Sequence, residues 1–404
     1  MNTVSERGVA DSAVPSREAL AMIERLIALP TVSRDSNLGL IEMARDHLQA
    51  LGAKTRLTYD QSGQKANLFA TLGEGRRPGV VLSGHTDVVP IDGQDWASDP
   101  FKAEVRGGRL YGRGSADMKG FIGIALTYAP RFLAAIDGAA LDAPLHYSLS
   151  YDEEVGCLGV RGLIKDLEEA GIRPAACLVG EPTSMQPIIA HKGTHRFRCR
   201  VHGREAHSSY VTQGVNAIEY AARLVVFIRN IAERLAQIEQ RDYGFTVPYT
   251  TLSTGTIRGG IAANVVPKDC EFQFDVRTLP TASIDTIKGE IEAYAAQLRA
   301  QMQAEDDSAG IELHHASSTQ GLDASETDAI VQYAMRLSGN HSTGKVSYGT
   351  EAGLFQSAGI PSVICGPGDI AQAHTPNEFV ELAELARCER FMDQMLTTPY
   401  PALA

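Results

Sequence analysis

Short, mostly apolar segments recur along the chain and predict β-strands. The clearest is the run at 79–82, Gly-Val-Val-Leu, which has the continuous apolar pattern of a strand buried on both faces. Strands are predicted at 54–59, 67–71, 79–82, 145–150, 177–179 and 361–365. Amphipathic helices are predicted between them, the first opened by Ser16 as an N-cap and others at 37–51, 121–132 and 382–396. This alternation predicts an α/β domain with a mainly parallel sheet.

The pattern changes between 192 and 318. Residues 194–201 alternate with period two and carry basic side chains on one face, as in a half-exposed antiparallel strand. The elements predicted after it are a helix at 217–240, strands at 250–258 and 269–278, a helix at 283–304 and a strand at 311–316. This is the strand-helix-strand-strand-helix-strand order of a ferredoxin-like α+β domain. We therefore expect a domain at 192–318 inserted into a catalytic domain made of 1–191 and 319–404.

Histidines and carboxylates follow the predicted strands. They are His85 and Asp87 after 79–82, Glu153 and Glu154 after 145–150, Glu181 after 177–179, His374 after 361–365, and Asp117 just before a helix. Sites in parallel sheets collect at the carboxyl ends of the strands, so these side chains are expected to converge in one crevice. Alternatives stay open at this point. Asp117, or Ser115, could cap the helix at 121–132, and the adjacent glutamates could be solvated loop charge.

The composition argues against a nucleic-acid-binding, secreted or membrane-spanning protein. The 404 residues are 44% hydrophobic with a formal net charge of −12, which argues against nucleic acid or an anionic membrane as a partner. The six cysteines form no Cys-x-x-Cys pair, which fits a reducing compartment and offers no thiolate metal site. The N-terminus, a polar arm up to about Val14, lacks an apolar signal-peptide core, and no apolar run reaches the roughly 18 residues of a membrane span. We expect a soluble, cytoplasmic protein.

Two histidines and several carboxylates, without cysteine, suit Zn²⁺, Co²⁺ or Mn²⁺. Five ligands are too many for one open catalytic ion, but they suit two ions that share one carboxylate. Two such ions about 3.5–4 Å apart lower the pKa of a bridging water and polarise a carbonyl. One of the adjacent residues Glu153 and Glu154 can then bind metal while the other takes a proton from the water.

Five motifs resemble those of the M20 metallopeptidase and deacylase family, over nearly the whole chain after Ser16. They are Ser83-Gly84-His85-Thr86-Asp87, the stretch 112–120, Asp152-Glu153-Glu154-Val155-Gly156, Gly180-Glu181-Pro182-Thr183 and Ala373-His374. The resemblance implies that His85 and Glu181 bind one ion, that Glu154 and His374 bind the other, and that Asp117 bridges. It also implies that Glu153 is the general base and then the acid, and that Asp87 orients His85. Zn²⁺ is the expected ion, although the ligand types do not choose between it and Co²⁺.

Within the family, the stretches 96–101, 207–209 with 214–220, and 348–355 are most similar to members that remove the acetyl group from N2-acetyl-L-ornithine in arginine biosynthesis. In similar proteins the residue at His207 crosses a homodimer interface and donates to the oxyanion, and Asn264 looks like a second polar contact. Arg277 would bind the α-carboxylate of an N-acyl amino acid, the alternative being a surface arginine at a strand edge. Glu351 would contact the amine of the substrate side chain, the alternative being a buried N-cap or structural ion pair.

Other family activities share every metal ligand and stay open as alternatives. They are succinyl-diaminopimelate desuccinylase, aminoacylase and dipeptidase. A non-catalytic relative would be expected to lack a ligand or the general base, and none is missing here.

Overall fold

The computed structural model describes residues 13–400, which form two compact units. The first unit comprises the chain up to Ile189, Ala324–Gly344 and the chain from Thr350 onward. The second comprises Ala190–Asp323 and the short segment Lys345–Gly349. The predicted insertion at 192–318 falls within the second unit, and its definition as a separate domain stays a prediction. Most of the predicted N-terminal arm lies outside the described residues.

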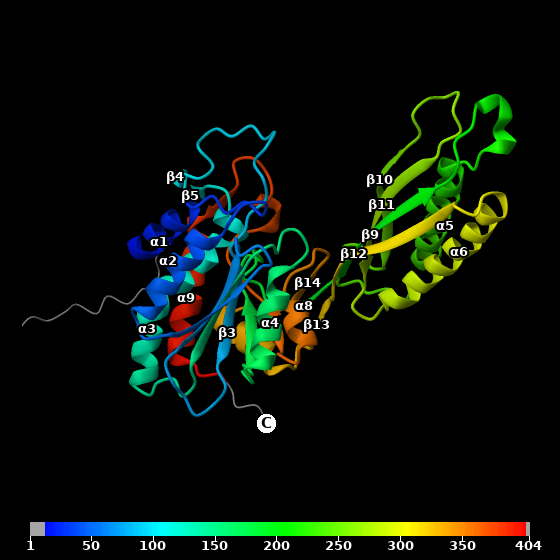
Figure 1. Cartoon of the computed structure of the whole chain (residues 1–404). Helices are drawn as coiled ribbons and strands as arrows, with labels where there is room; N and C mark the ends of the chain where they lie inside the picture. The colour runs from blue at the N-terminus through cyan, green and yellow to red at the C-terminus, as the bar shows by residue number, and fades with distance from the viewer. Residues whose placement is uncertain (1–12, 401–404) are drawn as a thin grey trace, which may run out of the picture. The chain divides into compact units, whose positions relative to one another are not determined.

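A large mixed sheet belongs mostly to the first unit (Figure 1), although β13 and the ends of β8 and β14 are counted in the second. Its order is β1 (Lys54–Tyr59), β2 (Ala66–Leu72), β6 (Leu145–Ser150), β3 (Val80–His85), β7 (Ala176–Val179), β15 (Ser362–Ile364), β8 (Ile188–His191) and β13 (Leu322–Asp323), with β14 (Gly344–Val346) also paired to β8. The central strands β6, β3, β7 and β15 run parallel, and the outer pairs are antiparallel. Every residue of these four strands is buried, which confirms the largely parallel, buried sheet predicted from the apolar runs.

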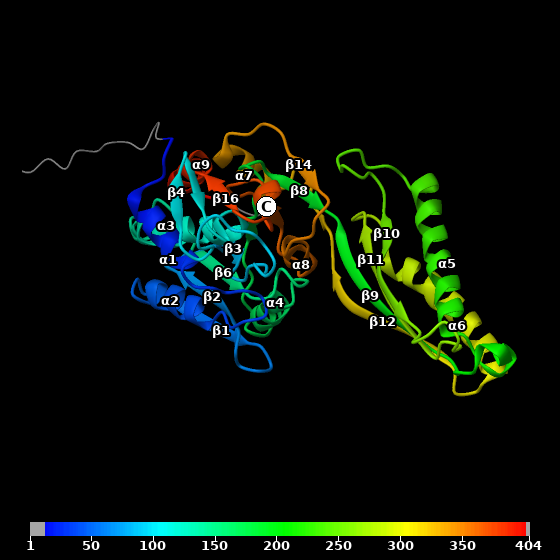
Figure 2. The ribbon, with the colours of Figure 1, turned by 90° about the horizontal axis from the view of Figure 1, so that it is seen from above.

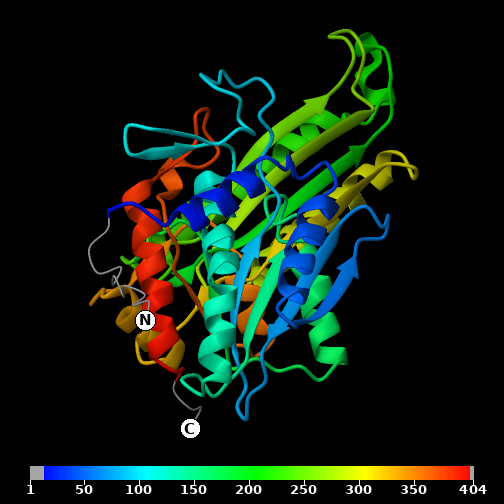
Figure 3. The ribbon, with the colours of Figure 1, turned by 90° about the vertical axis from the view of Figure 1, so that its left-hand side faces the viewer.

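Helices cover both faces of this sheet (Figures 1 and 2). One face carries α2 (Leu38–Gln49), α3 (Gly120–Asp137), α7 (Ala329–Ser338) and α9 (Leu382–Thr397), with α1 (Arg17–Ile27) against α3. Figure 3 shows α1, α2, α3 and α9 side by side in front of the strands. The other face carries α4 (Gly159–Glu169) and α8 (Ala352–Ser357). Ser16 caps α1 by accepting a hydrogen bond from the Ala19 amide, as predicted. No helix in the described part of the chain has both the length and the apolar composition of a membrane span.

The register of the parallel strands brings their carboxyl ends level with one another. His85 of β3 pairs with Ser150 of β6, and Ser83 pairs with Val179 of β7. The loops that follow these strands therefore start at the same edge of the sheet. Gly180 lets the loop that follows β7 pass close to α3, because a Cβ at this position would lie only 2.1 Å from the Phe121 ring.

The second unit contains an antiparallel sheet with two helices on one face (Figure 2). The sheet order is β10 (Thr251–Gly259), β11 (Asp269–Thr278), β9 (Gly193–His202) and β12 (Gly310–Thr319), and the helices are α5 (Ala217–Ile238) and α6 (Ile284–Glu305). The chain order of these elements agrees with the predicted ferredoxin-like order. Buried and less buried residues alternate along β9, as its period-two pattern predicts. The use of this unit as a lid and dimerisation domain stays a prediction.

Several short elements were not predicted. They include the three-stranded sheet of β4 (Glu104–Arg106), β5 (Arg109–Tyr111) and β16 (Phe379–Glu381), together with β8, β13, β14, α7 and α8. Strands of two to four residues are too short to show a hydrophobic period, so the sequence pattern does not reveal them. The small sheet matters for the site because it joins the segment before Asp117 to the segment after His374.

Candidate metal centre

His85 is the last residue of β3, and its imidazole ring faces a cluster of carboxylates. Its side chain is 1% exposed. Its Nδ1 lies 2.9 Å from the main-chain oxygen of Asp87, so a proton on Nδ1 leaves the Nε2 lone pair free for a metal. Nε2 lies 2.9 Å from Oδ1 of Asp117 and 3.9 Å from Oε1 of Glu181.

Asp117 lies between the two histidines of the cluster. Its Oδ1 is near His85, and its Oδ2 is 3.2 Å from Nε2 of His374. Asp117 does not cap α3, nor does Ser115, because a short irregular turn (Ser115–Lys119) comes before this helix and no side chain caps it. The Asp117–Met118 peptide bond is cis. One carboxylate with an oxygen toward each histidine is the arrangement that a bridging metal ligand needs.

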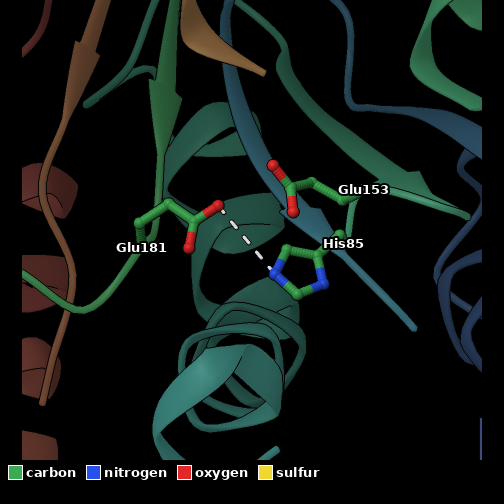
Figure 4. Close-up of side chains that lie close together, drawn as sticks. All are labelled: His85, Glu153 and Glu181. Carbon is green, nitrogen blue, oxygen red and sulfur yellow. Dashed lines mark ion pairs between the residues drawn. The ribbon is translucent and has the colours of Figure 1, made fainter. Parts of the chain in front are cut away.

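The glutamates complete the cluster. Figure 4 shows the carboxylates of Glu153 and Glu181 turned toward the space beside the imidazole of His85. Ligand atoms of these three residues lie within 4.8 Å of one another, and so do those of His85, Asp117 and Glu154. Glu154 also lies 3.0 Å from Nε2 of His374. The structure thus brings together all five predicted metal ligands and the predicted general base.

The electrostatics of the cluster favour bound cations. Burial raises the pKa of Glu153 to about 8, that of Glu154 to about 7, and that of Glu181 well above its usual value. Burial also opposes ionisation of Asp117, but hydrogen bonds from His374 and His85 lower its pKa below the usual range. Hydrogen bonds to Asp117 and Glu154 raise the pKa of His374 to about 10. If all four carboxyl groups ionise, their negative charge exceeds what two imidazoles can offset, and this oxygen and nitrogen donor set fits divalent ions.

The carboxylate of Asp87 does not hold His85 in the way that the resemblance implies. Its carboxylate Oδ1 lies 3.7 Å from Nδ1 of His85, too far for a hydrogen bond, and only its main-chain oxygen holds the imidazole. The carboxylate instead accepts hydrogen bonds from the main-chain N–H groups of Glu153, at 3.0 Å, and Glu154, at 3.3 Å. It also accepts one from the Ser33 hydroxyl at 2.7 Å. The side chain of Asp87 therefore holds the turn that carries the general base and a metal ligand.

Two residues that contact the cluster, Cys157 and Glu378, are not among the site residues predicted from the sequence. The Cys157 thiol donates to Oε1 of Glu153 at 3.1 Å. Glu378 is 1% exposed and accepts a hydrogen bond from the main-chain N–H of Asp117 at 3.1 Å. The available signal was spacing, since each lies four residues after a predicted site residue, Glu153 or His374. Spacing alone cannot show that these side chains turn back toward the site.

Glu351 is not placed as an accessible contact for a substrate. It is 1% exposed, and its carboxylate accepts hydrogen bonds from the hydroxyls of Ser83, at 3.3 Å, and Ser150. Burial raises its pKa to about 7. It occupies the N-cap position of α8 without a side-chain capping bond, and it has no ion pair within the described residues. Its burial argues against the predicted contact with a substrate amine. Of the two alternatives, the buried N-cap position is observed without a capping hydrogen bond, and the ion pair is not observed in the described part of the chain.

The three remaining predicted residues belong to the second unit. His207 is exposed, and its Nδ1 accepts a hydrogen bond from Ser209 N–H at 3.0 Å. The main-chain N–H of Ser208 donates to the main-chain oxygen of Asn264 at 3.0 Å, so His207 and Asn264 lie on paired segments. Arg277 donates to Asp275 at 2.7 Å and to the Thr194 hydroxyl at 2.9 Å. The substrate-binding roles of these residues stay predictions.

The sequence matches a known family over most of its length. Residues 81–398 match the model described as peptidase family M20/M25/M40. The chain belongs to this family. An acetylornithine deacetylase of Pasteurella multocida is 36% identical over 374 residues, which cover 89% of this chain and 92% of that protein. The resemblance inferred from the motifs is confirmed, and the protein is a metal-dependent hydrolase.

Solved structures share the fold at low sequence identity. A tripeptidase from Staphylococcus aureus has a TM-score of 0.72 at 19% identity, covering 96% of this chain and 99% of that one. A Bacillus subtilis protein described as a dinuclear metal-binding peptidase of family M20 has a TM-score of 0.59 at 18% identity, covering 94% and 96%. Dinuclear metal binding therefore occurs in the family to which this chain belongs.

The hydrogen bonds of Asp87 lead to a stability prediction. Replacing Asp87 with alanine leaves the Glu153 and Glu154 amides and the Ser33 hydroxyl without their acceptor, so the Asp87→Ala variant should lose about 1–3 kcal/mol of unfolding free energy. Urea denaturation measures this loss. The control is Asp92→Ala, because Asp92 is 63% exposed and solvent screens its ion pair with Arg34, so the urea midpoint of this variant should stay near that of the wild type. Equal urea midpoints for the two variants would contradict the structural role of Asp87.

Proposed function

We propose that the protein is a two-metal amidohydrolase that removes the acetyl group from N2-acetyl-L-ornithine, yielding L-ornithine and acetate in arginine biosynthesis. The observation that carries the reaction type is Asp117, whose two carboxylate oxygens face His85 and His374. A carboxylate in that position suits a bridge between two divalent ions. The choice of substrate is supported by the P. multocida relative, which is named acetylornithine deacetylase.

The proposed ligands divide between two ions. His85 and Glu181 would hold the first ion, Glu154 and His374 would hold the second, and Asp117 would serve both. Zn²⁺ is the proposed ion, and Co²⁺ would suit the same ligands. When bound, such a pair lowers the pKa of a water molecule and polarises the acetyl carbonyl.

Glu153 is proposed to move the proton. It takes a proton from the attacking water as the water oxygen bonds to the acetyl carbon. It then delivers that proton to the nitrogen as the carbon–nitrogen bond breaks, which releases acetate and the amine of ornithine. The thiol of Cys157 donates to Oε1 of Glu153, so Oε2 is the oxygen proposed to face the water.

Residues of the second unit are proposed to bind the substrate. The Ser209 amide occupies Nδ1 of His207, so the proton of a neutral ring lies on Nε2, which can donate to the developing oxyanion. Asn264 supplies a second polar contact from the paired segment. Arg277 binds the α-carboxylate of the N-acyl amino acid.

We also propose a homodimer formed through the second unit. Several large apolar side chains of this unit are exposed, among them Tyr210 at 62%, Val226 at 58%, Ile257 at 52% and Ile261 at 84%. The strand β10 lies at the edge of its sheet, where main-chain groups can pair with another chain. Light scattering should give twice the chain mass of 43.4 kDa. A molar mass of one chain at micromolar concentration would contradict the dimer.

A cytoplasmic location fits this proposal. All six cysteines are buried and none forms a disulfide, as expected in a reducing compartment. The proposed partner is a small N-acyl amino acid, with no nucleic acid or membrane. Recovery of the native protein in the membrane or secreted fraction of its source cells would contradict the location.

The substrate proposal predicts a preference within a panel of amides. After EDTA treatment and addition of Zn²⁺ or Co²⁺, hydrolysis should be much faster for N-acetyl-L-ornithine than for other substrates. The panel should include N-succinyl-diaminopimelate, an aliphatic N-acetyl amino acid and a dipeptide, which represent the alternative activities of the family. A preference for one of these would retain the two-metal mechanism and replace the proposed substrate.

The role of Glu153 predicts a catalytic defect without metal loss. Glu153→Gln keeps the size of the side chain but cannot carry the proton, so kcat should fall by about 10²–10⁴-fold. Metal content, measured by mass spectrometry, should match that of the wild type. Glu168→Gln, an exposed position on α4, is the control. Near-normal kcat in Glu153→Gln would eliminate this residue as the base.

A further inference from the structure

A buried carboxylate anchors the turn that ends at Asp117. Glu378 is 1% exposed, and its carboxylate accepts four hydrogen bonds. They come from Nη1 of Arg113 at 2.7 Å and from the main-chain N–H groups of Gly114 at 3.1 Å, Ala116 at 3.0 Å and Asp117 at 3.1 Å. Three contacts to the main chain within four residues fix the backbone of this turn, so they also fix where the Asp117 side chain starts.

The same network reaches the main chain of His374. Arg113, itself 1% exposed, donates through Nη2 to the side-chain oxygen of Gln94. The side-chain nitrogen Nε2 of Gln94 donates to the main-chain oxygen of His374 at 3.0 Å. The Trp96 indole donates to the same Gln94 oxygen at 3.1 Å, and its ring centre lies 5.0 Å from the Arg113 guanidinium carbon. We call Glu378, Arg113 and Gln94 the loop clamp.

His374 depends on its main chain more than the other ligands do. Its φ of +61° is a left-handed conformation that a residue with a Cβ rarely adopts. Its side chain is 50% exposed, whereas that of Glu154 is 7% exposed. It lies in the segment between the short helix η3 (Ile370–Gln372) and β16. Few neighbours pack around such a side chain, so contacts that hold the backbone decide where the imidazole points.

The ligands of the first ion are positioned by other means. His85 ends the buried strand β3, and Glu181 follows the buried strand β7 in the same parallel sheet. Neither residue has a hydrogen bond to the loop clamp within the described part of the chain. The sheet therefore sets these two ligands, while the loop clamp acts on the segments that carry Asp117 and His374.

We propose that the loop clamp positions His374 and Asp117, and so sets the affinity of the site for the second ion more than for the first. This inference rests on the proposed two-metal function. The members of the loop clamp differ in reach. Of the two ligand-bearing segments, Gln94 contacts only that of His374 directly and reaches the Asp117 turn only through Arg113, so its loss should mainly weaken the second ion. Glu378 also holds the Asp117 turn, so its loss should weaken both ions, since Asp117 bridges them.

The test is a metal titration of folded variants. Apo forms of the wild type, Gln94→Leu and Glu378→Gln are titrated with Zn²⁺ against a chromophoric chelator, which reports two dissociation constants without any substrate. Wild type should bind two equivalents. In Gln94→Leu one of the two Kd values should rise about 10–100-fold, the range typical for groups that orient metal ligands, and the other should change far less. In Glu378→Gln both Kd values should rise.

The matched control is Glu381→Gln. Glu381 is the last residue of β16 and lies three residues after Glu378. It forms an ion pair with Arg109 at 2.8 Å and has no hydrogen bond to the loop clamp among the described residues. This variant should titrate like the wild type. Circular dichroism and apo melting temperatures confirm that the variants are folded. If Glu378→Gln does not fold, Gln94→Leu decides the outcome alone.

The outcomes separate this inference from the proposed function. Wild type that binds two ions, with Gln94→Leu binding both equally well, would overturn the loop clamp and leave the two-metal proposal intact. Equal weakening of both ions in Gln94→Leu would overturn its selective action on the second ion. Wild type that binds one ion or none would contradict the two-metal proposal and this inference together.

Discussion

The close approach of negative charges around Asp117 is the constraint on which this structure depends. Four carboxyl groups share a largely buried site with only two imidazoles, and each carboxylate loses most of its hydration there. Such an arrangement is unfavourable unless cations offset it, so the site is expected to gain stability from the ions that it binds. The fold must hold these groups close even though they repel one another.

Two buried carboxylates outside the cluster provide that restraint by the same physical means. Asp87 accepts hydrogen bonds from the amides of Glu153 and Glu154, and Glu378 accepts them from the turn that ends at Asp117. In both cases a carboxylate binds the main chain of the turn and not the side chain of the ligand. The ligand carboxylate therefore keeps its oxygens for the metal, while its backbone is fixed by charge-assisted hydrogen bonds.

In the proposed function, the first unit supplies the metal ligands and the second unit supplies the substrate contacts. The metal cluster is built wholly within the first unit, from strand ends and loops of one parallel sheet. The residues proposed to bind the acyl amino acid, His207, Asn264 and Arg277, all lie in the second unit. This division gives a physical reason why one family can include deacetylases and peptidases: the metal site can stay the same while the substrate contacts change.

The sequence alone was enough to predict the central sheet and the metal cluster. The strand β3 is recognisable because a strand buried on both faces must be continuously apolar, and its end is marked by His85. Sites form at the carboxyl ends of parallel strands, so Glu153, Glu154 and Glu181 could be expected beside it. The approach of His374 and Asp117 was expected on the same ground, and the resemblance to the family implied their roles as ligands.

Other features were decided only by the tertiary structure. The short strands β5 and β16 carry too few residues for a pattern, yet their pairing joins the Asp117 and His374 segments. The carboxylate of Asp87 turns to main-chain amides, Glu351 is buried between two serines, and Glu378 turns back toward Asp117. A hydrophobic pattern records which face of an element is buried, because that depends on neighbours along the chain. It does not record which distant amide a buried carboxylate reaches, because that depends on how separate segments meet.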